Sequence, residues 1–262
     1  NQGRCCPTRA SLVTGLQPHQ VGIGHMTAPP GQPLGFEGPY QGYLNDNCTT
    51  LAEVLKGAGY KTLMTGKWHL GIDRKECWPL QRGFDRYYGC LSGAINYFKP
   101  GGDRGLTVGN DPIETPEGFY ATDTFTDKAI EYIDEATQDN EDPFFLYLAY
   151  NAPHWPMNAK WEDYQKYRGK YKDGWRSLMK ARNERQRQLG LLSESTTPAE
   201  HPGPLWESLD EKQRDRLDAV TRELVGEFQN SEQIVRIGQA DRGAALVLHE
   251  LCELADRQGA FE

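Results

Sequence analysis

A thiol and a guanidinium lie close together near the start of the chain, in the stretch CCPTRASLVTG. Pro7 has a preset φ and no N–H to lose, so we expect a short helix that begins at Pro7 and stops at Gly15. Cys5 would then lie just outside the positive helix end, which favours a thiolate, an oxyanion or a bound sulfate or phosphate group. The planar guanidinium of Arg9 could add several hydrogen-bond donors for such an anion. The stretch alone is equally compatible with a buried cysteine beside a structural arginine.

A lysine and a histidine follow the first predicted strand. Residues 59–71 read GYKTLMTGKWHLG, which predicts a helix stop, a strand over 60–64 and a tight turn that presents Lys67, Trp68 and His69. Lys67 and His69 alternate along the chain, so both side chains can face one side. Ligands of open α/β sheets bind beyond the carboxyl ends of strands, which makes this pair a candidate site.

A second histidine follows another predicted strand. Pro143 opens the apolar run at 144–150, and the chain then turns through NAPHWP at 151–156, which places His154 between two prolines. A histidine in such a stiff loop is usually structural. Because His154 also lies at a strand end, its segment is the third that could contribute to the same site.

These segments resemble the motifs of the type I sulfatases, a family of enzymes that hydrolyse sulfate esters. The first stretch matches the family pattern C-x-P-[S/T]-R-x-x-x-L/V-T-G from Cys5 to Gly15, including Thr8 and Thr14. The second matches G-Y-x-T-x-x-x-G-K-W-H-x-G at every fixed position, and APHWP resembles the A-P-H-x-P element. Two long motifs in the family's order make the resemblance strong.

The resemblance implies a formylglycine mechanism with five catalytic residues. In the family the cysteine that corresponds to Cys5 is oxidised by a maturation enzyme, and the hydrated aldehyde attacks sulfur with one hydroxyl and expels sulfate with the other. Arg9 would orient the hydrate, and Lys67 would bind sulfate. His69 would hydrogen-bond the hydrate and help its proton leave. His154 would contact the bridging oxygen and aid the leaving group, so that it binds substrate together with Lys67.

Cleavage of a sulfate ester needs these roles on chemical grounds too: an in-line nucleophile, cations around the equatorial oxygens and an acid for the departing alcohol. An unmodified Cys5 thiolate would form a thiosulfate-type adduct with no obvious internal release.

The resemblance also implies calcium, which the family holds with four carboxylate or amide side chains and the formylglycine. Only Cys5, once modified, maps to that metal site. We expect the other ligands to lie outside this chain, so that residues 1–262 form a partial sulfatase catalytic domain without its N-terminal strand and its C-terminal part. The isolated segment should bind calcium poorly and hydrolyse little or nothing.

Two other functions stay open at this point. A phosphonate monoester or phosphodiester hydrolase of the alkaline phosphatase superfamily would use the same nucleophile on phosphorus, and the motifs fit both. A non-catalytic domain that keeps the scaffold but is never matured is the other alternative. For the leading function, the expected substrate is a small-molecule or glycan sulfate ester, in the manner of an arylsulfatase.

The composition predicts a soluble globular domain, with 37% hydrophobic and 25% charged residues. No apolar run approaches the roughly 18 residues that span a bilayer, so we expect no transmembrane segment. A net charge of -8 argues against nucleic acid as a partner. We expect the true N-terminus to lie outside this sequence, so the compartment stays open, with the bacterial periplasm or cytoplasm expected.

Six cysteines are spread through a chain too large to need a disulfide framework. Their spacing suggests no zinc site, and C-x-x-C is absent, which disfavours a redox pair or a vicinal disulfide. We expect Cys252 and the nearby His249 to be structural. The cysteines are Cys5, Cys6, Cys48, Cys77, Cys90 and Cys252.

These elements predict an α/β fold with a mostly parallel central sheet flanked by helices, the alkaline-phosphatase-like sulfatase domain. Residues 16–47 should form an irregular loop at the wall of the site, and residues 77–118 a second loop region with short edge strands. A helix is expected over 123–137, before the apolar strand. Another should begin with a capping box of Thr50 and Glu53 and end at Gly59. Its apolar stripe would be Leu51, Val54, Leu55 and Ala58.

The charge and the expected secondary structure change in the C-terminal part of the chain. Residues 160–190 carry ten Lys or Arg against four Asp or Glu, which suits either a solvated face or an anion-attracting entrance. We expect 160–218 to be a helical insertion near the site, interrupted by a linker at 196–204. Helices should continue from 207 to the end, where the family's pattern is not recognisable after about residue 218.

Overall fold

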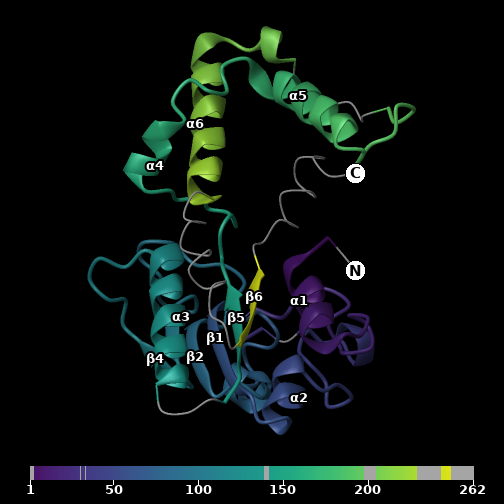
Figure 1. The fold of residues 1–262 in the computed structure, drawn as a ribbon, viewed down its shortest axis with the longest axis vertical. Helices are drawn as coiled ribbons and strands as arrows, with labels where there is room; N and C mark the ends of the chain where they lie inside the picture. Colours follow the sequence, from purple (N-terminus) through teal and green to yellow (C-terminus); the bar gives the residue numbers. More distant parts are fainter. Residues whose placement is uncertain are drawn as a thin grey trace. The chain divides into compact units, whose positions relative to one another are not determined.

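The computed structural model describes residues 3–29, 31–32, 34–138, 142–197, 205–228 and 243–248, with residues 220–228 and 243–248 as backbone. The chain divides into two compact units, which are described separately. The first holds the described residues up to Pro156 and strand β6 (Gly243–Leu248), and the second begins at Met157 (Figure 1).

The first unit is built on a six-stranded sheet in the order β4-β3-β2-β1-β5-β6. Strands β1 (Lys61–Lys67), β2 (Arg86–Cys90), β5 (Phe144–Ala149) and β6 run parallel to one another. Two short antiparallel strands, β3 (Leu106–Val108) and β4 (Asp111–Ile113), extend the sheet beyond β2. The predicted α/β fold with a mostly parallel sheet is confirmed.

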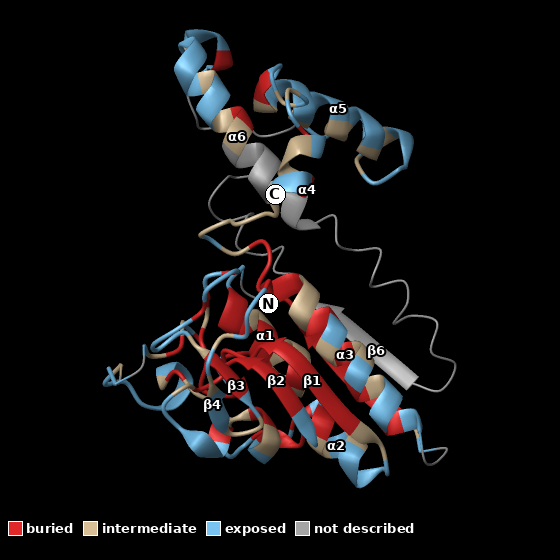
Figure 2. Cartoon of the chain, turned by 90° about the vertical axis from the view of Figure 1, so that its left-hand side faces the viewer, coloured by how far each residue is buried: buried red, intermediate tan, exposed pale blue. Residues whose placement is uncertain are grey.

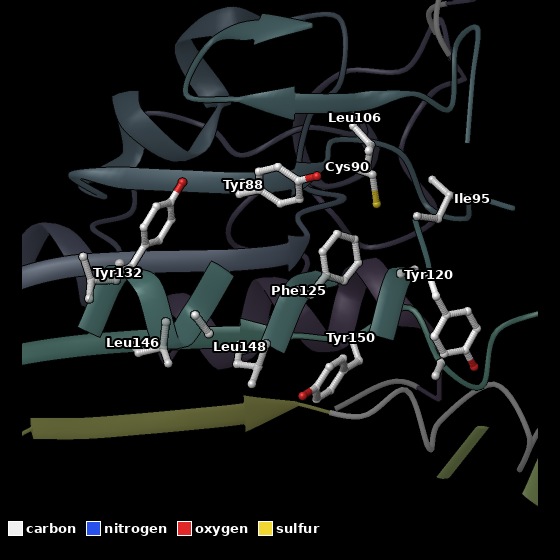
Figure 3. Close-up of a cluster of buried hydrophobic side chains, with 14 of the residues drawn as sticks. Tyr88, Cys90, Ile95, Leu106, Tyr120, Phe125, Tyr132, Leu146, Leu148 and Tyr150 are labelled. Atoms are coloured by element: carbon white, nitrogen blue, oxygen red, sulfur yellow. The ribbon is translucent and has the colours of Figure 1, made fainter. Parts of the chain in front are cut away.

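Helices cover both faces of this sheet. Helices α1 (Cys5–Thr14) and α2 (Leu51–Gly57) pack on one face, and helix α3 (Ala121–Thr137) packs on the other (Figure 2). On the α3 side, Phe125 lies edge-on to Tyr88 with 6.2 Å between ring centroids (Figure 3). Successive residues of β5 alternate between the two cores, as the pleat of a strand requires. Phe144, Leu146 and Leu148 face α3, whereas Phe145, Tyr147 and Ala149 face α1 and α2.

Helix α1 differs from its prediction by two residues at the start. It begins at Cys5, so Pro7 is its third residue, where the missing N–H costs no helical hydrogen bond. The prediction that Cys5 lies just outside the helix is therefore wrong, because Cys5 is the first helical residue. Gly15 ends the helix as predicted, in the left-handed conformation with φ 69°.

Strand β1 continues three residues beyond its predicted end and includes Lys67, which was expected in a turn. Residues 77–118 contain the predicted edge strands β3 and β4, but also β2, which pairs with β1 inside the sheet. Gly66 makes these pairings possible. It has φ +100°, and a Cβ atom there would lie 1.9 Å from the carbonyl oxygen of Ala149.

Helix α2 begins with the predicted capping box. The Thr50 hydroxyl accepts from the Glu53 amide, and the Glu53 carboxylate accepts from the Thr50 amide. The helix ends at Gly57, before the predicted stop at Gly59. The predicted apolar stripe is wrong in part, because Leu51 and Val54 are exposed while Ala52 is the buried residue.

Two further sequence predictions concern the loop at 16–47 and the C-terminal part of the chain. The described residues between 16 and 47 are irregular as expected, apart from a 3-10 turn at Gly38–Tyr40. Helices were expected from residue 207 to the end, and this is wrong for β6, which pairs with β5. His249 and Cys252 lie outside the described residues. The five cysteines that the structure describes are free thiols.

The second unit is helical where it is described. It contains α4 (Trp161–Lys166), α5 (Gly174–Gln188) and α6 (Glu211–Phe228). Trp206 packs edge-on against Trp175, with 5.3 Å between ring centroids. That residues 160–218 form an insertion near the site stays a prediction. Among the residues that the structure describes, no helix has the length and apolar character that crossing a bilayer requires.

Candidate active site

The carboxyl ends of β1, β2 and β5 share one edge of the sheet, and Arg9 fixes helix α1 at that edge. Its guanidinium is 1% exposed. Nη1 donates to the carbonyl of Lys67 (2.6 Å) and to the hydroxyl of Tyr147 (3.3 Å), and Nη2 donates to the carbonyl of Tyr150 (3.2 Å). Because Lys67 ends β1 and Tyr150 follows β5, one side chain ties the helix to two strand ends.

Cys5 and His69 meet directly in this region. The Sγ atom of Cys5 lies 3.3 Å from Nδ1 of His69, and both residues are buried. The pKa of Cys5 is lowered, foremost by a hydrogen bond from Cys6 and further by His69 and the charge of Lys67, which together outweigh burial. Two of the predicted site residues are thus in contact, and the charge of Lys67 acts on Cys5.

The backbone around His69 is held in an uncommon conformation. His69 has φ 61°, and no other non-glycine residue among those described has a positive φ. Its amide donates to the carbonyl of Leu91 (3.2 Å). A Cβ atom on Gly93 would lie 2.3 Å from Cε1 and 2.5 Å from Nε2 of the His69 ring. The segment after β2 therefore supports both the backbone and the ring of His69.

His154 lies on the loop that follows β5 and is half-buried. Its carbonyl accepts from the hydroxyl of Tyr97 (2.9 Å), and its Nδ1 is 2.6 Å from the carbonyl of Trp155. A carbonyl can only accept, so Nδ1 carries the proton and Nε2 is the acceptor nitrogen of the neutral ring. Arg9 connects this loop to the rest of the site, because it binds the carbonyl of Tyr150.

Cys6 is a buried neighbour that the sequence interpretation did not place in the site. Burial raises the pKa of its thiol, and its Sγ accepts from the amide of Thr27 (3.3 Å). The same sulfur lies 3.5 Å from Sδ of Met26. Only the doubled cysteine in the sequence could have pointed to it.

The residues described do not fit the calcium ion that the sequence resemblance implies. Within the described parts of the chain, one group of three or more His, Cys, Asp or Glu residues has ligand atoms within metal-binding reach: Cys5, Cys6 and His69. It offers sulfur and nitrogen, whereas calcium takes six to eight oxygen ligands. That the calcium carboxylates lie elsewhere stays a prediction.

Sequence reasoning also missed two residues that hold the site. The hydroxyl of Tyr147, within β5, accepts a hydrogen bond from Arg9, and Gly93 packs against the His69 ring. Both residues lie far along the chain from the residues that they contact, and no local sequence motif identifies them.

Known proteins resemble this chain in sequence. The model of the sulfatase family matches residues 1–217. An uncharacterised sulfatase of Schizosaccharomyces pombe is 35% identical over 223 residues, which is 79% of this chain and 40% of that protein. The arylsulfatase of Klebsiella aerogenes is 32% identical over 217 residues, 79% of this chain and 46% of the enzyme. The chain spans less than half the length of either relative.

The fold agrees with this similarity. The structure of Ps i-CgsB in complex with k-i-k-neocarrahexaose superposes with a TM-score of 0.61 at 23% identity, over 95% of this chain and 48% of that chain. At this identity the match supports the fold alone. Because the family model matches most of the chain, as the motifs predict, the chain belongs to the sulfatase family.

Proposed function

We propose that the protein hydrolyses sulfate esters, in the manner of an arylsulfatase, through a formylglycine made from Cys5. The observation that supports this best is the contact between Cys5 and His69 at the first turn of α1, beside the buried Lys67. Formylglycine would supply a hydrated aldehyde, with one hydroxyl to attack sulfur and a second to expel sulfate. Other side chains of the site would stabilise the developing charge and transfer protons.

Residue 5 lies where negative charge is stabilised. The first turn of α1 presents the positive end of the helix dipole, and the Lys67 charge favours an anion at this position. Nδ1 of His69 is placed to accept a proton from the side chain at position 5 and to return it. Lys67 would also hold an equatorial oxygen of the sulfate.

Arg9 and His154 take different parts in this proposal. Arg9 sets the helix against the strand ends through its contacts with two carbonyls, and we propose that it also orients the hydrate, as the resemblance implies. His154 has Nδ1 on a carbonyl, so its protonated form would present Nε2–H to the departing oxygen.

We propose that calcium serves the intact protein as it does the family, with Lewis-acid chemistry at the sulfate and with carboxylate ligands outside the described residues. The organic half of the substrate would be a small phenol or a sugar. Relatives of this chain include an arylsulfatase and the N-acetylgalactosamine-6-sulfatase of Homo sapiens, which is 30% identical over 167 residues. A formylglycine-generating maturation enzyme is the protein partner, and the bacterial periplasm or cytoplasm is the proposed compartment.

Mass spectrometry of the peptide that contains Cys5 tests the nucleophile. In the intact protein purified from its own host we expect the mass loss that replaces CH₂SH by CHO. An unmodified thiol in every molecule would refute the proposal and favour a non-catalytic domain.

Kinetics of the matured protein test the reaction. We expect kcat/KM to be higher for an aryl sulfate than for an aryl phosphonate monoester, with Cys5→Ala inactive on both. Faster cleavage of the phosphonate would instead assign the site to phosphorus chemistry.

A further inference from the structure

We infer that the unmodified chain binds one soft metal ion, Cu⁺ foremost and Zn²⁺ with the same donors, between the sulfurs of Cys5 and Cys6 and the ring of His69. The ligand atoms of these three residues all lie within 4.8 Å of one another, and all three residues are buried. In the part of the chain that the structure describes, no other group of His, Cys, Asp or Glu meets this condition.

The spacing suits a metal with little rearrangement. A tetrahedral zinc ion with typical bond lengths separates a sulfur from a nitrogen ligand by about 3.6 Å and two sulfurs by about 3.8 Å. Sγ of Cys5 is 3.3 Å from Nδ1 of His69. Since no pair of ligand atoms is more than 4.8 Å apart, a contraction of about 1 Å at most completes the site.

The donor types select the metal. Two thiols and an imidazole suit thiophilic ions, and the Met26 thioether, 3.5 Å from Sγ of Cys6, is placed to become a further soft ligand. Thiolate and thioether together favour Cu⁺ and accept Zn²⁺. Calcium and magnesium require oxygen ligands, so this site does not serve the family's metal.

The surroundings stabilise the charge that such a complex carries. Two thiolates around Cu⁺ leave a net charge of about -1, and around Zn²⁺ a net charge of zero. The amide of Thr27 donates to Sγ of Cys6, the first turn of α1 presents its positive end, and the charge of the buried Lys67 acts on both thiols. Binding releases the thiol protons and changes no oxidation state, so the reaction balances without another reagent.

One consequence rests on the proposed function. Oxidation of Cys5 to formylglycine removes one of the two sulfurs, so the matured chain loses the soft-metal site. The soft-metal site therefore belongs to the unmodified chain alone.

Metal competition tests the inference on the reduced chain, with the Cys5 thiol verified by mass spectrometry. Under anaerobic conditions the chain should remove one Cu⁺ per molecule from bicinchoninate and should give thiolate charge-transfer absorption with Co²⁺ in place of Zn²⁺. Cys5→Ser and Cys6→Ser should each weaken binding at least about 100-fold. Cys48→Ser is the matched control, because this buried thiol contacts the carbonyl of Asn45 (3.3 Å) away from the site.

The inference is overturned if the wild-type chain binds no stoichiometric Cu⁺, or if Cys5→Ser and Cys6→Ser bind as tightly as Cys48→Ser. Should the serine variants fail to fold by circular dichroism, X-ray absorption of the Cu⁺-loaded wild-type chain decides, because the site predicts sulfur and imidazole nitrogen together around the metal. A metal environment without sulfur contradicts the site. Sulfate hydrolysis is measured on the matured protein and metal binding on the thiol form, so either proposal can fail alone.

Discussion

Substitution of Gly93 by alanine should displace the ring of His69 and thereby slow catalysis. The added Cβ would lie 2.3 Å from Cε1 and 2.5 Å from Nε2, whereas ordinary contact begins near 3.4 Å. The ring must therefore retreat by about 1 Å, which moves Nδ1 from its position 3.3 Å from Sγ of Cys5. A displacement of this size in a catalytic group costs on the order of 100-fold, or about 2.7 kcal/mol in the barrier.

The assay is kcat/KM of the intact, matured protein on an aryl sulfate, with the melting temperature measured alongside. Gly57→Ala is the matched control, because Gly57 ends helix α2 with nothing within 4 Å of the added Cβ and should keep full activity. The decisive comparison repeats Gly93→Ala in a His69→Ala background. If the clash acts through the ring, the second substitution adds little there.

Two results would refute this reasoning. Activity of the folded Gly93→Ala variant within twofold of wild type would mean that the ring adapts without loss. An equal loss in both backgrounds would mean that Gly93 acts by another route than His69.

Three more predictions follow from the described contacts. Arg9→Lys should lower the free energy of unfolding by about 2–3 kcal/mol in urea titrations, because a lysine cannot reach both strand-end carbonyls, whereas exposed Arg104→Lys should be neutral. For Asp85, partial burial raises the pKa, but the ion pair with Lys56 and two hydrogen bonds from Thr62 outweigh it, so the pKa is lowered. The stabilisation is then present above the unfolded pKa of about 3.9 and is lost as the pH falls through the lower folded value. Asp85→Asn should lower the free energy of unfolding by about 1 kcal/mol at pH 7, after allowance for solvent screening. It should also make this free energy less dependent on pH below pH 4. An unchanged pH dependence would contradict the assignment. Finally, calorimetric titration of this chain alone should detect only weak calcium binding, and tight binding would show that the described residues supply more oxygen ligands than the structure indicates.

The sequence predicted most of the local elements that carry the site. Helix α1 ends at Gly15, the capping box of α2 is present, and α3 and β5 lie where their patterns placed them. Each of these has a local signal, such as a cap, an apolar period or a run bounded by proline. Cys5 and His69 were also expected to share a site, and their contact agrees with this expectation.

The errors fall where pairing between distant segments decides the structure. Strand β2 is only five residues long, and it is a strand because it lies between β1 and β3. Strand β6 reads GAALVL, a sequence that a helix would also accept, and its pairing with β5 overrides that preference. Lys67 was expected in a turn after a strand over 60–64, yet Gly66 continues β1 and Lys67 ends it.

The glycines of the inner strands set the spacing of the strand ends at the candidate site. A Cβ atom on Gly66 would lie 1.9 Å from the Ala149 carbonyl oxygen, and one on Gly89 would lie 1.8 Å from the Gly66 carbonyl oxygen. Side chains at these positions would push β5, β1 and β2 apart just before their carboxyl ends. Arg9 could not then reach the carbonyls of both Lys67 and Tyr150. The motif glycine next to Lys67 is therefore required for close approach of the strands, and the position of helix α1 depends on it as much as on Arg9 itself.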